Sequence, residues 1–321
     1  MNEARLLEAI EGSFLAPLLK KESITDISYN GQALYFEDSL RGRKKAGIAV
    51  DKEEVGDFLR QIANYAEKQF SYSVPILDVS FSRYRLNACY TNLVRVGDEK
   101  SYSFCLRLLG AEKNFADDES FLPKKAKEIL QKAVEERASI VIGGVTSSGK
   151  TELQKCLLSS LPEGEKVIVI DNAGELERLR GKAGVDLTSW SVDERFPASS
   201  FSSLIKNGLR NDPDWLVLAE SRGGEALDAL TSAMSGAAIM MTIHARSLEA
   251  MPNRLARLCL MGDERLLRSE VLEDIRGHFA YWVYMEKQIR SDRSIARKLT
   301  GIGRLSPQKE EMEILYERRK A

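Results

Sequence analysis

A glycine-rich stretch that ends in lysine and threonine has the residue types that bind phosphate. Gly144, Gly149, Lys150 and Thr151 fit the pattern G-x-x-x-x-G-K-[ST], between an apolar β-branched run and a helix-like run. In such a loop, successive backbone N–H groups and a helix N-terminus surround the anion, and glycine is needed where a Cβ would collide with it. The predicted nucleotide-binding residues are Gly144, Val145, Thr146, Ser147, Ser148, Gly149, Lys150 and Thr151.

The last two residues of the pattern have distinct predicted roles. Lys150 would reach the β- and γ-phosphates of a nucleoside triphosphate, and the Thr151 hydroxyl would bind Mg²⁺. A glycine turn between a strand and a helix needs no ligand, but a chance match to this pattern is expected in only about one chain in a hundred of this size. The sequence therefore predicts a site for ATP and Mg²⁺.

Hydrolysis of a bound nucleotide also needs a carboxylate that positions water or metal. Glu220 ends the apolar run WLVLAE, and a carboxylate at that strand end would face Mg²⁺, directly or through a water. The alternative for Glu220 is a solvated loop glutamate. Asp171 and Glu175, in KVIVIDNAGELE, follow another apolar run and form a second candidate pair.

The elements that must position these residues alternate between strands and helices. From residue 124 to 321 the short apolar runs IVIGG, KVIVID, DWLVLAE and AAIMMTIHA are separated by helical stretches. This alternation predicts βαβ units, a mainly parallel sheet, and a nucleotide at the carboxyl ends of the strands. The tail YWVYMEKQIRSDRSIARKLTGIGRL and the later EEMEILYERRK predict one or two antiparallel strands.

Residues 1–110 have a different pattern and predict a smaller α+β domain. ITDISYNGQALYFED alternates apolar and polar residues around Asn30-Gly31, which predicts a β-hairpin. A helical pattern follows from Asp51 to about Gln69, and two strand-like runs, ILDVSFSRYRLNACY and SYSFCLRLLG, predict an antiparallel sheet. The polar residues 111–123, which end in proline, predict a linker between the two domains.

Composition weighs against several classes of function. Charged residues are 30% of the chain but sum to a net charge of −1, so there is no global basic field and direct nucleic-acid binding is not expected. The basic run KQIRSDRSIARK is interpreted as a solvated strand face.

The four cysteines form no C-x-x-C pair and there are only two histidines, which makes a disulfide framework or zinc site a weak interpretation. The first twenty residues contain acidic residues and no long apolar run, so we expect a cytoplasmic protein.

The order of four motifs resembles a known family. GGVTSSGKT, VIVIDNAGEL, LRNDPDWLVLAESRGGEALDAL and MTIHARS are similar to the ATPases of type II secretion, type IV secretion and type IV pili. ITDISYNG, SYSVPILD and SRYRLNACY resemble the N-terminal domain of the branch that serves type IV secretion and tight-adherence pili. The resemblance covers nearly the whole chain and implies a RecA-like P-loop NTPase domain behind the smaller α+β domain.

The resemblance assigns roles to acidic residues. Glu220 and Arg222 match an acidic motif usually written G-E-x-R-G, with Ala219 in place of its first glycine, and Glu220 would polarise the attacking water. Asp171 and Glu175 match the family's acidic box, usually E-D-x-x-E-L. This chain has Asp and Asn at the first two positions, so one methylene of reach and one negative charge are lost.

The resemblance also assigns roles to three basic residues. His244 matches the second histidine of a histidine box and would sense the γ-phosphate or orient a neighbour, whereas an isolated histidine is more often a satisfied core residue. The first histidine of the box is absent, because SGAAIMM stands in its place. Arg85 and Arg107 match arginines that reach the nucleotide from the N-terminal domain across the domain cleft; the alternative is a solvated surface arginine.

These observations predict an ATP-hydrolysing motor subunit of a type IV secretion or pilus assembly system. By resemblance it would form a homo-oligomer, a hexameric ring, and dock on an inner-membrane platform protein at the cytoplasmic face of the membrane. One alternative is a nucleotide-gated assembly subunit with weak or no hydrolysis. A P-loop kinase is disfavoured because no arginine-rich lid segment follows the loop, and a nucleic-acid motor is disfavoured by the charge balance.

Overall fold

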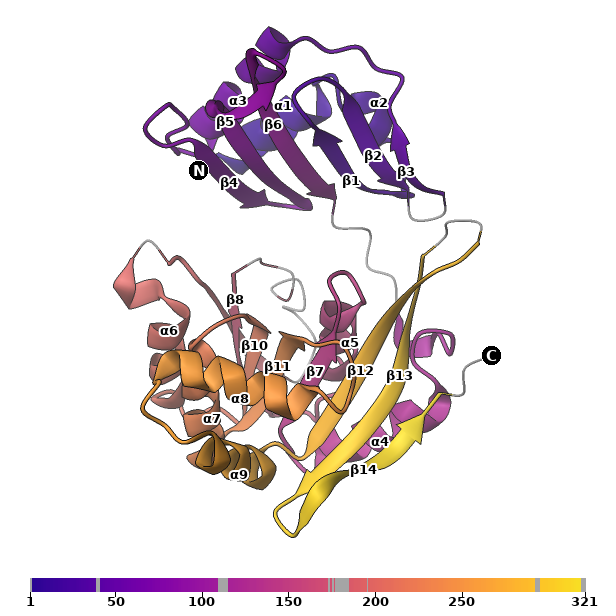
Figure 1. Ribbon diagram of the computed structural model, residues 1–321, viewed down its shortest axis with the longest axis vertical. Coiled ribbons are helices and arrows are strands. Elements are labelled where there is room, and N and C mark those ends of the chain that lie inside the picture. The colour runs from indigo at the N-terminus through magenta and orange to yellow at the C-terminus, as the bar shows by residue number, and fades with distance from the viewer. Residues whose placement is uncertain are drawn as a thin grey trace. The chain divides into compact units, whose positions relative to one another are not determined.

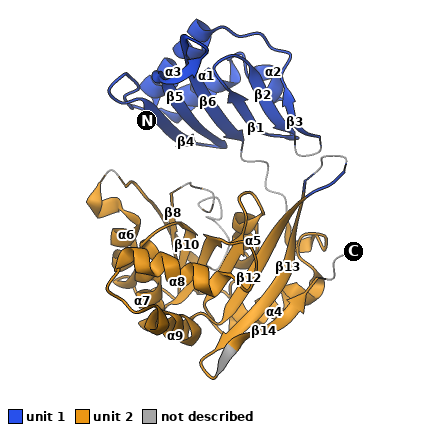
Figure 2. Cartoon of the chain, viewed as in Figure 1, with its two compact units in different colours: residues 1–113, 289–295 blue, residues 114–288, 296–321 orange. Residues whose placement is uncertain are grey.

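The chain divides into two compact units (Figure 2). The first comprises residues 1–113 with 289–295, and the second comprises residues 114–288 with 296–321. The computed structural model describes residues 2–38, 41–108, 115–172, 174, 176, 185–194, 196–291 and 295–318. Each unit is described by itself below.

The first unit is a six-stranded antiparallel sheet with helices on one face (Figure 1). The strand order is β3-β2-β1-β6-β5-β4, and each paired neighbour runs antiparallel. Its elements are α1 (Glu3–Glu11), α2 (Ala16–Leu19), β1 (Ile24–Tyr29), β2 (Leu34–Asp38), β3 (Gly42–Lys45), α3 (Lys52–Tyr65), β4 (Ile76–Phe81), β5 (Tyr84–Val96) and β6 (Glu99–Leu108). The predicted hairpin is confirmed as β1 and β2.

Strict alternation along the strands builds the core of this unit. In β4 every second residue is buried, and the buried set packs against the apolar faces of α1 and α3. The opposite face of the sheet carries exposed or half-buried side chains, among them Ile76, Asp78, Ser80 and Arg107, as expected when only one face of an antiparallel sheet is covered. Asp51 caps α3 by accepting the backbone N–H of Glu54 at 2.7 Å, which fixes where the helix begins.

The second unit is built on an eight-stranded sheet of order β14-β13-β12-β7-β11-β10-β8-β9. The six strands from β12 to β9 run parallel, and β13 pairs with β14 antiparallel. Its elements are η1 (Phe115–Asp117), α4 (Lys124–Glu135), β7 (Ile140–Gly144), α5 (Lys150–Leu158), β8 (Lys166–Asp171), β9 (Asp186–Ser191), η3 (Pro197–Ser199), α6 (Phe201–Leu209), β10 (Trp215–Ser221), α7 (Glu225–Met234), β11 (Ala238–His244), α8 (Met251–Gly262), α9 (Arg268–His278), β12 (Tyr281–Ile289), β13 (Ile295–Ser306) and β14 (Lys309–Glu317).

Two details differ from the expectation for this sheet. The tail forms three strands, and the first of them, β12, lies parallel to β7, because α8 and α9 carry the chain back across the sheet before β12 begins. A further strand, β9, extends the other edge of the sheet in parallel with β8. Its sequence, DLTSWS, is polar and exposed or half-buried, so no apolar run marked it as a strand.

Both faces of the second sheet are buried. Val141 packs into a core with α6 to α9, whereas its neighbours Ile140 and Ile142 pack into a core with α4 and α5. Strands covered on both faces are continuously apolar, which explains the uninterrupted runs in the sequence. Among the described residues no helix has both the length and the apolar character needed to cross a membrane.

The segment predicted as a linker, residues 111–123, is partly built into the second unit. Residues 111–114 lie outside the described residues. Phe121 and Leu122 are 1% and 3% exposed and belong to the core that holds α4 and α5. The backbone N–H of Leu299 in β13 donates to the carbonyl of Phe121 at 2.9 Å. Residues 115–123 therefore belong to the folded second unit.

Candidate functional site

The predicted nucleotide-binding residues form one tight loop between β7 and α5. Ser148 donates its N–H to the carbonyl of Val145 at 3.2 Å, and Ser147 and Gly149 have φ of +60° and +98°. At Gly144 a Cβ would lie 2.4 Å from the carbonyl oxygen of Met285 and 2.4 Å from Ser148 Oγ. No side chain fits there, so the loop requires glycine at this position.

Lys150 begins α5 and turns its ammonium group back into the loop. The residue is 8% exposed, and Nζ donates to the carbonyl oxygens of Gly144 and Val145 at 3.3 and 3.2 Å. Nζ also lies 3.4 Å from Nδ1 of His244. An ammonium group has no lone pair, so in this contact Nδ1 can only be the acceptor.

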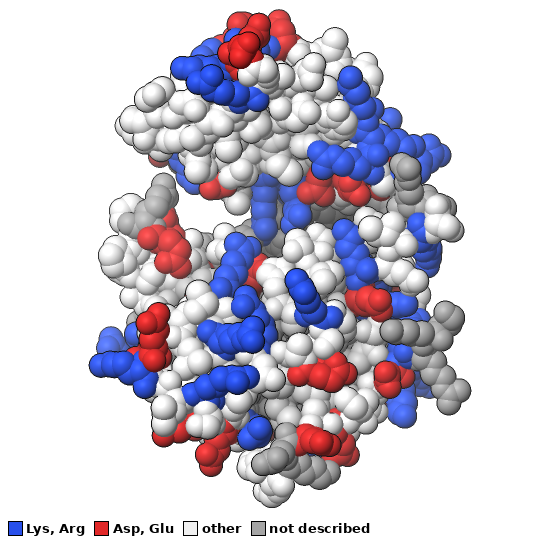
Figure 3. Space-filling model, viewed as in Figure 1, with Lys and Arg blue, Asp and Glu red and all other residues white. Residues whose placement is uncertain are grey.

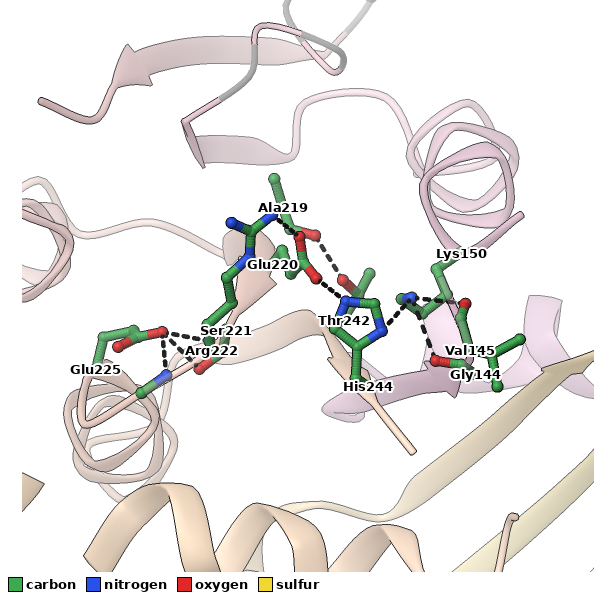
Figure 4. Close-up of polar contacts among 11 residues, drawn as sticks. Gly144, Val145, Lys150, Ala219, Glu220, Ser221, Arg222, Glu225, Thr242 and His244 are labelled. Carbon is green, nitrogen blue, oxygen red and sulfur yellow. Dashed lines mark hydrogen bonds and ion pairs between the residues drawn. The ribbon is translucent and has the colours of Figure 1, made fainter. Parts of the chain in front are cut away.

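His244 connects the lysine to Glu220. Figure 4 shows the imidazole between the two side chains, with Nε2 in contact with Oε1 of Glu220. The other carboxylate oxygen, Oε2, accepts from Arg222 at 2.6 Å. Three elements, α5, β10 and β11, thus bring Lys150, His244, Glu220 and Arg222 into one connected row, because the carboxyl ends of parallel strands meet at the same edge of the sheet.

The environment of Glu220 keeps it ionised. Burial by itself would raise the pKa of the carboxyl, but the hydrogen bond and charge of Arg222, with smaller contributions from His244 and Lys150, outweigh burial and hold the pKa below its ordinary value. The Glu220 side chain is 18% exposed. A carboxylate at this place can orient water or a cation at neutral pH.

An irregularity in β10 aims Glu220 at the site. Leu218 pairs with Met241 and Ser221 with Ile243, so residues 219 and 220 stand opposite Thr242 alone. An extra residue of this kind bends a strand and re-aims a side chain. Thr242 Oγ1 donates to the carbonyl of Ala219 at 2.6 Å, and Gln154 Nε2 donates to that of Leu218 at 2.9 Å. Side chains from β11 and α5 thus bond the carbonyls at the end of β10.

Glu225, which the sequence reasoning did not identify, fixes the turn after Glu220. Its Oε1 accepts from the N–H groups of Arg222 and Gly223, at 2.5 and 2.9 Å, and from Ser221 Oγ at 3.2 Å. An acidic residue in the first turn of α7 also complements the helix dipole. A glutamate at the start of a helical pattern, where acidic residues are enriched, was the only signal for this contact.

The predicted acidic box is only partly described. Asp171 ends β8, is 2% exposed, and accepts the N–H of Leu176 at 3.0 Å on Oδ2. This carboxylate therefore bonds the backbone at Leu176. Glu175 lies outside the described residues.

Arg85 and Arg107 belong to the first unit. They are direct partners on β5 and β6 and so share one face of the sheet, the one opposite the core. Arg107 Nε donates to Asp26 Oδ1 at 3.1 Å, and this pair is partly exposed. Two arginines side by side on a strand pair repel each other, and Asp26 offsets part of that repulsion. Their role at a nucleotide stays a prediction.

Both signs of charge occur on the visible face of each unit (Figure 3). No group of three or more His, Cys, Asp or Glu side chains that could hold a metal ion occurs within the described ranges.

Comparison with known proteins points to the same protein family as the sequence motifs. An uncharacterised protein of Bacillus anthracis is 27% identical over 275 residues, which is 84% of this chain and 60% of that protein. The type IV secretion system protein PtlH of Bordetella pertussis is 34% identical over 135 residues, 41% of this chain and 40% of that protein. The chain thus matches about 40 to 60% of the length of these relatives.

Solved structures share the fold. The Legionella pneumophila ATPase DotB aligns over 88% of this chain and 78% of its own, with a TM-score of 0.68 and 20% identity. The pilus retraction motor PilT, solved with ADP, aligns over 89% and 82% with a TM-score of 0.64 and 18% identity. The family model described as type II/IV secretion system protein matches residues 96–276, more than half of the 321 residues. The chain belongs to the type II/IV secretion system protein family.

Proposed function

We propose that this chain is an ATPase that drives a type IV secretion or pilus assembly system. The observation that carries the proposal is the connected row Lys150, His244 and Glu220, beside the loop whose residues fit the phosphate-binding pattern. A cation, an imidazole and an ionised carboxylate side by side are the groups that phosphate-ester hydrolysis uses.

Each residue of the row has a role in the proposed reaction. The loop N–H groups and Lys150 bind the β- and γ-phosphates, and Lys150 exchanges the carbonyl oxygens of Gly144 and Val145 for phosphate oxygens. Glu220 orients the attacking water. His244 holds Glu220 on one side and Lys150 on the other, so it responds when Lys150 moves to the γ-phosphate. Arg222 keeps Glu220 ionised.

The residues fit a magnesium ion that is shared with the substrate. Thr151 follows Lys150 and its side chain is half-buried, and Glu220 is an ionised carboxylate at the next strand but one. Mg²⁺ is usually held by one or two protein oxygens together with phosphates and waters. In this site Thr151 and Glu220 would hold the ion, which would supply charge neutralisation at the phosphates.

Further parts of the proposal come from family resemblance. We propose that the second unit is a RecA-like domain, that Arg85 and Arg107 complete the site, and that Asp171 and Glu175 contribute as the acidic box. The proposed assembly is a hexamer on the cytoplasmic face of the membrane, docked on an inner-membrane platform protein. The names of DotB and PilT, an ATPase and a pilus retraction motor, support the proposed ATPase activity.

Two substitutions test the site. Lys150→Ala should abolish ATP turnover and weaken ADP binding, whereas Lys155→Ala is the matched control, since Lys155 lies on the same helix and pairs with Glu152. Glu220→Gln should retain ADP binding and lose turnover by about a hundredfold or more. Turnover is measured as phosphate release and binding by titration with fluorescent ADP. Normal hydrolysis by Lys150→Ala would refute the assignment.

A nucleotide-gated assembly subunit with weak hydrolysis is the second candidate. Two observations favour it: Oε2 of Glu220 accepts from Arg222 while Oε1 contacts Nε2 of His244, and the lowered pKa of Glu220 makes it a weak base. Phosphate release measured with and without membranes separates the two functions. Binding without release in both conditions would favour the gated subunit.

A further inference from the structure

A side chain from outside the loop pattern is bonded to the phosphate loop. Arg297, near the start of β13 (Figure 1), donates from Nε to the carbonyl oxygen of Ser147 at 2.9 Å. The side chain is half-buried. Arg297 and the fully buried Leu299 are two residues apart on one strand, so both point to the face that packs on α4 and α5. The strand therefore directs Arg297 at the loop.

Ser147 has the backbone conformation in most need of support. Its φ is +60°, in a region of backbone conformation that residues other than glycine rarely adopt. It is the third residue of the turn that Ser148 N–H closes on the Val145 carbonyl, where a type II turn requires positive φ. The peptide between Ser147 and Ser148 is thus held at both ends, its C=O by Arg297 and its N–H by Val145.

A second contact places β13 directly behind the loop. A Cβ at Gly149 would lie 2.9 Å from Phe121 Cε2 and 3.6 Å from Arg297 Cβ. Phe121 is itself bonded to β13 through the Leu299 N–H. Phe121 and Arg297 form one continuous support, and both come from segments that the loop pattern does not include.

We propose that Arg297 is a positioning residue for nucleotide binding. It holds the Ser147–Ser148 peptide in the orientation in which the loop receives a phosphate group, and it acts through Ser147 without contact to the reacting atoms. The inference rests on the proposed function, because it adds a residue to the same site.

The test uses the full chain with Arg297→Met. The dissociation constant for fluorescent ADP and the KM for ATP should rise together by about tenfold, equivalent to about 1.4 kcal/mol, while kcat changes by less than about threefold. Arg297→Lys, which retains a charge and a donor, should recover part of the affinity. Lys298→Met is the matched control: it removes the same charge from the same strand, but Lys298 bonds Gln288, so its ADP affinity should equal that of wild type.

A second pair of variants separates positioning from direct contact. Glycine takes positive φ without strain, so Arg297→Met should weaken ADP binding less in a Ser147→Gly background than in the native one. Equal losses in both backgrounds would overturn the inference, and so would a lower kcat with unchanged ADP affinity, which would place Arg297 at the transition state. If Arg297→Met does not fold, Arg297→Gln carries the same comparison.

The outcomes distinguish this inference from the proposed function. A wild-type chain that binds no ADP would remove the proposed function itself. A wild-type chain that binds and hydrolyses nucleotide, together with an Arg297→Met variant of unchanged affinity, would reject only the role of Arg297.

Discussion

Glu225 offers a perturbation whose effect can be worked from its contacts. One carboxylate oxygen, Oε1, accepts from two backbone N–H groups and from a serine hydroxyl in the turn that links Glu220 to α7. Glu225→Ala removes all three acceptor contacts at once. Glu225→Gln retains an oxygen acceptor and removes only the negative charge. The pair therefore separates the geometry of the cap from its charge.

The expected loss of stability is about 2 kcal/mol for Glu225→Ala. Removing a capping side chain costs about 0.5–2 kcal/mol, and a hydrogen bond to a charged group contributes about 1.5–3 kcal/mol. Water can replace part of this cap because Arg222 is exposed, so the three contacts together stay near the upper capping value. For a unit of this size about 1 kcal/mol lowers the melting temperature by about 2–4 °C, which gives about 4–8 °C. Glu225→Gln should lose about half as much.

The same cap should affect turnover without affecting binding. Glu225 holds the backbone of Arg222, whose guanidinium bonds Glu220 at 2.6 Å, whereas the phosphate loop lies on other strands. We expect kcat to fall about tenfold, or about 1.4 kcal/mol, with ADP affinity unchanged. Calorimetry of the full chain and steady-state phosphate release give the two values. Glu264→Ala, an exposed glutamate between α8 and α9, is the control.

A melting temperature of Glu225→Ala within about 1 °C of wild type, together with normal kcat, would refute the reasoning. It would mean that water replaces all three contacts at no cost. A normal melting temperature with a reduced kcat would instead limit the role of Glu225 to aiming Arg222.

Two further predictions concern buried groups of the second unit. Thr242→Val should lower the free energy of unfolding, measured in urea, by about 1–2 kcal/mol. Valine has the shape of threonine but no hydroxyl, so the buried carbonyl of Ala219 loses its donor. Thr231→Val is the control, since the Thr231 hydroxyl bonds an exposed helix carbonyl. Burial raises the pKa of Cys259 to about 12 and that of Cys156 to about 11, so a disulfide reagent at pH 8 should modify neither thiol at its ordinary rate in the folded chain. The pKa of both thiols is higher in the folded chain than in the unfolded one. Their contribution to the free energy of unfolding should therefore fall as pH rises above about 9. Rapid modification of a thiol in native protein that disappears in a Cys259→Ala variant would contradict the burial of Cys259.

The sequence was sufficient for the features that depend on local pattern. Strands buried on both faces read as uninterrupted apolar runs, and this predicted β7, β8, β10 and β11 and their parallel order. The loop between β7 and α5 is contiguous, so residue types and spacing were enough to predict which residues form it, and their contact with a nucleotide stays a prediction. β12 was misassigned because strand direction depends on where α8 and α9 return the chain, which an apolar run does not encode.

Contacts between distant segments were outside the reach of pattern reasoning. Arg297 lies in the basic run that was interpreted as a solvated strand face, and for Lys298, which bonds Gln288, that interpretation agrees with the structure. For Arg297 it is wrong, because the guanidinium bonds the carbonyl of Ser147, 150 residues away. Alternation along β13 could have distinguished Arg297 from Lys298, since Arg297 points to the same face of the strand as the apolar Leu299.

The direction of the Glu220 side chain depends on contacts that its own segment of sequence does not encode. WLVLAES contains no glycine or proline to mark the irregularity in β10, and in a regular strand Ala219 would pair with Thr242 and Glu220 with Ile243. The extra residue is tolerated because the carbonyls of Leu218 and Ala219 find donors on Gln154 and Thr242, and an unbonded buried carbonyl would cost more than the bend. The direction of the carboxylate is therefore set by two uncharged side chains on other elements. A substitution at either should displace Glu220 although neither residue carries any chemistry of its own.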